Sequence, residues 1–226
     1  MTPMNAASRS SSLAGRLLDM LVSPGDVFDE VLAAPPRLAN WLVPTLLVAL
    51  TSLVLLGAAS KEGGLGFGKP EALDSAAAQT EPGSADWQRV STAATCVGAF
   101  AGTFWSAFLL WFIGRAFLRA RFSFWKAVEV VALTGIIVAL GAVVTALLIG
   151  VFGDPASRPA LSIFARHLPT TSRVHMALDT VNFFYLWTAT VLAIGLSRLS
   201  GVSFKESAFW VFGYWVVARL ALIVLG

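Results

Sequence analysis

The chain has 226 residues, of which 57% are hydrophobic and only 13% are charged, and its mean hydropathy is +0.75. Soluble domains carry about 25% charged residues, so this sequence lacks the polar surface of a water-soluble domain. The formal net charge is +3, but the basic residues stand singly or in short segments beside apolar blocks. That distribution is typical of membrane proteins and argues against nucleic acid as a partner. The single cysteine, Cys96, excludes a disulfide framework within one chain.

Residues 1–38 are expected to form a cytoplasmic N-terminal tail with two short amphipathic helices. The first covers residues 13–21, where leucines recur at helical spacing. The second follows the segment SPGD at 23–26, in which Ser23 can cap the helix and Pro24 fits its first turn. Such helices before a first span either lie on the membrane surface or pack against the bundle. No cleavable signal peptide is recognisable before the first span.

Five apolar blocks are long enough to cross a bilayer, which takes about 20 residues. We therefore predict an all-α integral membrane protein, a bundle of five transmembrane helices preceded by short amphipathic helices. Residues 39–226 form the predicted membrane domain, with residues 60–90 as a flexible loop outside the membrane. The predicted spans cover residues 40–59, 92–113, 127–152, 178–196 and 208–225.

The second span contains Gly98 and Gly102 in a GxxxG pattern, and Ser106 continues the row of small residues. Such a row lets two helix backbones approach closely. The pattern is common in apolar spans rich in alanine and glycine. We therefore expect it to serve helix packing within the chain rather than dimerisation.

Orientation is indicated by four basic residues in the short connection between the second and third spans. A short loop of this charge is expected in the cytoplasm, which places the N-terminus inside and the C-terminus outside. The turn that holds Arg198 and Lys205 falls on the same side. The four residues are also candidates for contact with lipid headgroups: Arg115, Arg119, Arg121 and Lys126.

Few polar side chains interrupt the spans, and Arg219 in the fifth is the most costly, at about 2.5–3.5 kcal/mol on insertion scales. Asp179 and Asn182 are its natural partners at the outer end of the fourth span, and we predict an Arg219–Asp179 contact. A structural ion pair is favoured over a gate or anion site. Glu129, near Lys126, Arg115 and Arg198 at the inner end of the third span, is expected to be a neutralised acid rather than a proton relay.

No catalytic constellation, metal site or cofactor-binding motif is recognisable, so no enzyme activity and no cofactor are expected. His167 and His175 lie in a loop with only Asp154 and Asp179 as possible additional ligands, which is too little for a convincing zinc site. The glycines between 63 and 68 lack the strand and helix context of a phosphate-binding loop.

Four segments resemble the Yip1 domain family, particularly its bacterial members. They are residues 21–31 (LVSPGDVFDEV), 122–127 (FSFWKA), 178–187 (LDTVNFFYLW) with Ile194-Gly195-Leu196, and 204–208 (FKESA). The resemblance covers residues 20–226 and implies a five-span bundle with a cytoplasmic N-terminus. Eukaryotic members associate with Rab GTPases in vesicle traffic, whereas the role of bacterial members is mostly undefined.

The resulting hypothesis is a non-enzymatic Yip1-like protein that organises membrane or partner proteins, in contact with the lipid bilayer, other membrane proteins or itself. The alternative is a small transporter or channel for an ion or small solute, with Arg219, Asp179, Asn182 and Glu129 along its path. Continuous polar space from Glu129 to Asp179 would favour transport, and a dry interior with an exposed small-residue face would favour assembly. The alanine-rich composition and the closer resemblance to bacterial members of the family suggest a bacterial cytoplasmic (inner) membrane.

Overall fold

A computed structural model describes residues 12–61, 85–165, 168–169 and 172–225. Within these ranges the chain is helical and has no β-strand. Five of its helices are long and apolar enough to span a membrane, so the predicted all-α fold with five spans is confirmed. They are α3 (Leu38–Lys61), α5 (Ala85–Ala116), α6 (Phe124–Phe152), α8 (Phe183–Ser200) and α9 (Phe204–Leu225).

The fourth span differs from its predicted bounds, because the chain breaks before it. Residues 178–180 belong to a separate short helix, α7 (Arg173–Thr180), and α8 starts only at Phe183. The Oδ1 atom of Asn182 accepts a hydrogen bond from the Phe184 backbone N–H at 2.9 Å, which caps the new helix. The predicted fourth span placed Asp179 and Asn182 in one helix. In the structure they do not share a helix.

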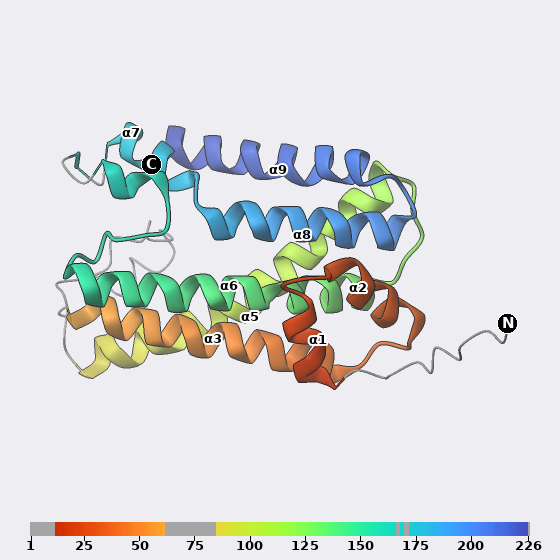
Figure 1. Cartoon of the computed structure of the whole chain (residues 1–226), viewed down its shortest axis with the longest axis horizontal. Coiled ribbons are helices and arrows are strands. Elements are labelled where there is room, and N and C mark those ends of the chain that lie inside the picture. Colours follow the sequence, from red (N-terminus) through yellow and green to blue (C-terminus); the bar gives the residue numbers. More distant parts are fainter. Residues whose placement is uncertain (1–11, 62–84, 166–167, 170–171, 226) are drawn as a thin grey trace, which may run out of the picture.

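Successive long helices run in opposite directions, so the bundle has two distinct ends (Figure 1). One, here called the α2 end, holds the N-terminal helices, the α5–α6 connection and the α8–α9 turn. At this end Phe117 after α5 stacks on Trp210 of α9 with ring centroids 4.1 Å apart. The opposite end, here called the α7 end, holds α7 and the last residues of α9. The two basic connections thus lie at the same end, as predicted.

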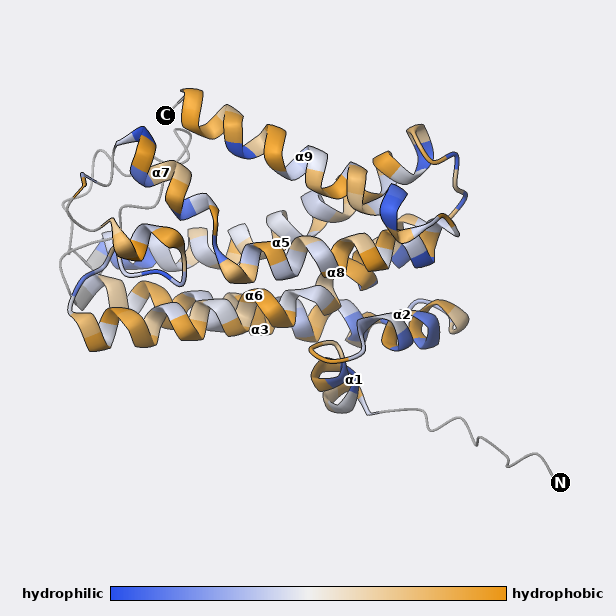
Figure 2. Ribbon diagram, turned by 45° about the horizontal axis from the view of Figure 1, so that its top comes forward, coloured by the Kyte–Doolittle hydropathy of each residue, from blue (hydrophilic) through white to orange (hydrophobic). Residues whose placement is uncertain are grey.

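Helix α6 forms the centre of the bundle, and α5 and α9 form its periphery. In α6, 39% of the most apolar window is buried, against 17% in α5 and 11% in α9. Helix α5 leans across the bundle (Figure 1), and apolar residues dominate the outer surfaces of the long helices (Figure 2). Exposed side chains such as Trp105, Phe209 and Val217 suit hydrocarbon as the surrounding solvent.

The two N-terminal helices, α1 (Leu13–Asp19) and α2 (Pro24–Ala33), pack against the bundle. Pro24 occupies the first turn of α2 as predicted, but Ser23 makes no capping hydrogen bond with its side chain. Phe28 is completely buried. A Cβ atom added at Gly195 would lie 3.2 Å from the Phe28 ring and 2.4 Å from Val130, so the missing side chain at Gly195 makes room for Phe28.

Two predicted segments fall outside the described residues: most of the N-terminal tail before Ser12, and most of the loop between the first two spans. Of that loop, residues 85–90 already belong to α5. The loop after α6 contains a single 3-10 turn, η1 (Leu161–Phe164).

We predict that Gly195→Ala destabilises the folded protein by about 1–3 kcal/mol, because the added methyl overpacks the contact between Phe28 and Val130. Thermal unfolding in detergent should show a lower midpoint. Gly213→Ala is the matched control, since no atom lies within 4 Å of its added Cβ. Equal midpoints for the two variants would contradict the account of Phe28 given above.

Candidate functional site

Glu129 is a fully buried carboxylate near the start of α6. Its Oε1 atom accepts hydrogen bonds from the backbone N–H of Arg37 at 2.7 Å and from Nδ2 of Asn40 at 2.8 Å. Its Oε2 atom lies 2.8 Å from Nζ of Lys126. Burial of a carboxylate is unfavourable unless it is paired and hydrogen-bonded, and here both oxygens have charged or polar donors.

Lys126 connects this carboxylate to the end of α2. Its Nζ atom also donates to the carbonyl oxygens of Val31 at 2.7 Å and Ala34 at 2.6 Å. The last carbonyls of a helix have no partner within the helix and favour a nearby cation. Lys126 therefore fixes α2 against α6, and its charge points into the protein. The expectation that it contacts lipid headgroups is wrong for this reason.

Arg16 extends the network to α1. Its Nη1 atom donates to Oδ1 of Asn40 at 3.0 Å, and its Nη2 atom lies 3.1 Å from Oε1 of Glu30. These contacts form a continuous chain through α1, α2, α3 and α6. We call it the Glu129 cluster, and it consists of Arg16, Glu30, Asn40, Lys126 and Glu129.

The other expected neighbours of Glu129 lie elsewhere. Arg198 pairs with Asp29 of α2, with Nη1 and Oδ2 3.3 Å apart, and Arg115 lies over the ring of Trp111 at 5.9 Å. The expectation that Arg115 and Arg198 neutralise Glu129 is therefore wrong, although Lys126 does so. The Arg198–Asp29 pair adds a second tie between α2 and the bundle.

Three of the basic residues in the α5–α6 connection remain at the surface. Arg115, Arg119 and Arg121 are exposed at the α2 end, where Figure 2 shows a concentration of polar residues. Arg119 has a φ of 53° at the point where the chain turns away from α5. These three stay available for lipid headgroups, and that contact stays a prediction.

At the α7 end, Asp179 is held by the loop that follows α6. Its Oδ1 atom accepts a hydrogen bond from Ser162 at 3.0 Å and lies 3.6 Å from Nε of Arg158. An isolated antiparallel bridge between Ala160 and Asn182 fastens this loop to the start of α8. The arrangement places Arg158 and Asn182 in the wall of one cavity.

The cavity has a volume of about 260 Å³ and lies between α3, α5, α6 and α8. Its polar lining includes Arg158, Asn182, Tyr185 and Thr188, and the rest is mainly apolar. None of its lining residues belongs to the Glu129 cluster. Val130, Leu133 and Ile137, which follow Glu129 along α6, are buried in the core. In the described part of the chain, no continuous polar space joins Glu129 to Asp179.

The predicted Arg219–Asp179 contact is wrong. The guanidinium of Arg219 lies over the ring of Tyr185 on α8, 4.6 Å from its centroid, while Asp179 interacts with Arg158 and Ser162. A cation over an aromatic face is stabilised by the ring quadrupole, most strongly when water is excluded. Tyr185 thus provides what the carboxylate was expected to provide, because α7 turns Asp179 toward the loop after α6.

Within the described part of the chain, the two glycines of the small-residue row on α5 make no close packing contact. Gly98 and Gly102 are exposed, and no atom lies within 4 Å of a Cβ added at either position. Ser106, the next member, is half-buried. The expectation of intramolecular packing for this row is therefore wrong at both glycines, and a role in contacts with another molecule stays a prediction.

Among the residues that the structure describes, no three His, Cys, Asp or Glu side chains come together as a metal site. His175 is buried on α7, and His167 lies outside the described residues. Sequence reasoning missed Arg16, Asn40 and Arg158. Asn40 carried a signal, because an amide at the first turn of an apolar span needs a partner.

Comparison with known proteins gives one family. The family model described as the Yip1 domain matches residues 18–226, which is nearly the whole chain. No curated protein and no solved structure gives a significant match. The matched region includes the Glu129 cluster apart from Arg16, together with the cavity and all five long helices.

We predict that Glu129→Gln lowers stability by about 3–5 kcal/mol, because it leaves the ammonium of Lys126 buried without a counter-charge. The double variant Glu129→Gln/Lys126→Met should recover part of this loss. Thermal unfolding in detergent and the rate of proteolysis between α2 and α3 would measure both effects.

Arg89→Gln is the control, since the Arg89–Asp86 pair is exposed and such pairs contribute about 1 kcal/mol or less. If the double variant lost as much stability as the single variants Glu129→Gln and Lys126→Met together, or more, Lys126 and Glu129 would not act as a pair.

Proposed function

Because the chain belongs to the Yip1 domain family and forms a multi-pass bundle, we propose that it organises membrane or partner proteins and has no enzymatic role. In this proposal the α2 end keeps the bundle in one rigid shape, and the peripheral helices provide the contact surface. The Yip1 family is not known for enzymatic activity, and the polar groups of the Glu129 cluster are engaged with one another.

The observation that carries the proposal is the uncovered face of α5. Gly98 and Gly102 are open to the surroundings, and Trp105 beside them is 59% exposed. A flat strip of glycines allows the backbone of a second helix to approach closely, and in a bilayer such packing is a main driving force for association. The aromatic side chain of Trp105 at the edge of the strip adds contact area and can fix the position of the second helix.

Transport of an ion or small solute is the alternative, and the cavity at the α7 end supports it. A conducting path must also reach the α2 end. The buried residues of α6 and the satisfied Glu129 cluster separate that end from the cavity, so the described residues favour assembly over transport.

We further propose that the α2 end faces the cytoplasm of a bacterial cell, with residues 1–38 on that side and 39–226 as the membrane domain. Basic residues concentrate in cytoplasmic loops, and eight of the described ones belong to the α2 end. They are Arg16, Arg37, Arg115, Arg119, Arg121, Lys126, Arg198 and Lys205.

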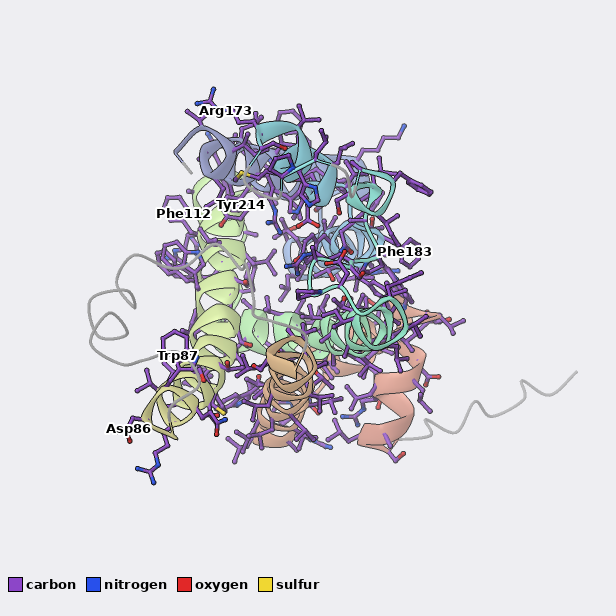
Figure 3. All side chains as sticks on the ribbon, turned by 90° about the vertical axis from the view of Figure 1, so that its left-hand side faces the viewer. Asp86, Trp87, Phe112, Arg173, Phe183 and Tyr214 are labelled. Atoms are coloured by element: carbon purple, nitrogen blue, oxygen red, sulfur yellow. The ribbon has the colours of Figure 1, made fainter. Side chains whose placement is uncertain are left out.

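Photocrosslinking in native membranes tests the proposed contact surface. Benzoylphenylalanine in place of Trp105 should give discrete protein adducts. At Phe183, which points outward from α8 (Figure 3) and is 62% exposed, it should give lipid adducts only. Gly102→Leu should remove the Trp105 adducts without lowering the thermal midpoint, because no described atom lies within 4 Å of a Cβ added at this exposed position.

Lipid adducts alone at Trp105, together with solute uptake by liposomes containing the pure protein, would reject assembly in favour of transport.

Cysteine labelling tests the orientation. In a Cys96→Ser background, a membrane-impermeant maleimide applied to intact cells should label Arg173→Cys, at the α7 end, and leave Arg121→Cys and Lys205→Cys unlabelled. All three side chains are exposed, so access to the thiol depends on the side of the membrane. Labelling of Arg121→Cys or Lys205→Cys from outside would contradict the proposed orientation.

A further inference from the structure

The cavity between α3, α5, α6 and α8 lies in the half of the bundle next to the α7 end. Its lining comes from the last part of α3, the first part of α5, the second half of α6 and the first two turns of α8. Figure 3 looks along the bundle from this end, with α5 on one side and α6 and α8 on the other. The cavity therefore lies at the depth of one leaflet of the bilayer.

Two polar groups in the wall have no partner in the described part of the chain. Asn182 is only 5% exposed. Its Oδ1 atom caps α8, but its Nδ2 amide donates to no described acceptor. The hydroxyl of Thr188 is buried and likewise without a partner. By contrast, the hydroxyls of Thr95 and Thr145 are satisfied by carbonyls of their own helices. Buried polar groups are normally hydrogen-bonded, so the buried Thr188 hydroxyl indicates a missing ligand, and the unused Asn182 amide is a further donor in the same wall.

The charge of the wall identifies the chemistry of that ligand. Arg158 contributes a guanidinium with five N–H donors, and no Asp or Glu is among the lining residues. Asp179 faces Nε of Arg158 from outside the lining. The positive end of the α8 helix dipole also lies at Asn182, although the backbone N–H groups of Phe183 and Phe184 already donate to the Pro159 carbonyl and to Oδ1 of Asn182. Although Asp179 pairs with Arg158 from outside, the lining itself contributes donors and no carboxylate, which favours an anionic oxygen ligand.

The remaining wall is apolar and includes Leu55, Leu56, Val138, Ala142 and Phe184. An inorganic anion would leave this part of the cavity without a matching contact, whereas an acyl chain would fill it. The volume of about 260 Å³ equals roughly nine water molecules at about 30 Å³ each. It can hold a headgroup phosphate and the start of one chain, and the rest of a lipid would remain in the bilayer.

We propose that this cavity binds a phospholipid with an anionic headgroup. The phosphate accepts hydrogen bonds from Arg158, Asn182 and Thr188, and an acyl chain lies along the apolar wall formed by α3 and α6. The site is independent of the proposed contact surface on α5, because Gly98, Gly102 and Trp105 do not line it.

Native mass spectrometry of the full chain in detergent tests the site. The added lipids are palmitoyl-oleoyl phosphatidylglycerol and phosphatidylcholine with the same chains. One phosphatidylglycerol should be retained in preference to phosphatidylcholine. Asn182→Asp keeps the acceptor that caps α8 but replaces the amide donor with a negative charge, so it should weaken retention about tenfold or more. Ala142→Phe should fill the cavity and abolish retention.

Two controls separate this site from general lipid contact. Arg173→Gln removes an exposed charge that points away from the bundle at the same end (Figure 3), and Leu147→Phe enlarges an exposed residue of α6 outside the cavity. Both should retain the lipid as the parent chain does. Should Asn182→Asp fail to fold, Thr188→Val tests the donor set with the capping residue intact.

Equal retention by the parent chain, Asn182→Asp and Ala142→Phe would show only lipid at the periphery and overturn the proposal. Displacement of the lipid by millimolar inorganic phosphate would show a free anion as the ligand and would also overturn it. Neither result bears on the adducts at Trp105, so failure here is distinguishable from failure of the proposed function.

Discussion

The buried carboxylate of Glu129 sets the arrangement of the α2 end. A charge in this position is tolerated only because an amide, a backbone N–H and an ammonium surround it. The donors belong to different segments of the chain. Arg37 and Asn40 lie at the start of α3. Lys126 belongs to α6 and also binds the carbonyl groups at the end of α2. Neutralising one acid therefore fixes the first span, the central span and the N-terminal helices relative to one another.

Two sequence segments that resemble the Yip1 family meet in space at this end. Phe28, from the segment LVSPGDVFDEV, lies against Gly195 of α8. The pair explains why an aromatic residue belongs in the first segment and a residue without a side chain in the second. The hydrophobic face of α2 thus completes the helix bundle, and the alternative of a helix lying on the membrane surface does not apply to it.

The sequence was sufficient for the number and order of the spans, because hydropathy and chain length act locally. It was insufficient for side-chain partners, which depend on how each helix is rotated. Arg219 illustrates the difference: its need for a partner was evident, but the break before Asn182 moved Asp179 away and left Tyr185 in its place. The same holds for Gly98 and Gly102, because α5 is rotated so that neither glycine meets a described atom of another helix.

The two ends of the bundle consequently differ in kind. At the α2 end, oppositely charged groups satisfy one another and hold four helices together. At the α7 end, no carboxylate lines the cavity itself, and Asp179 pairs with Arg158 from outside the lining. Among the described residues, the buried part of α6 and the Glu129 cluster separate the cavity from the α2 end. A ligand that enters and leaves from one leaflet does not have to cross this barrier, so the asymmetry suits a protein that holds lipid or protein partners.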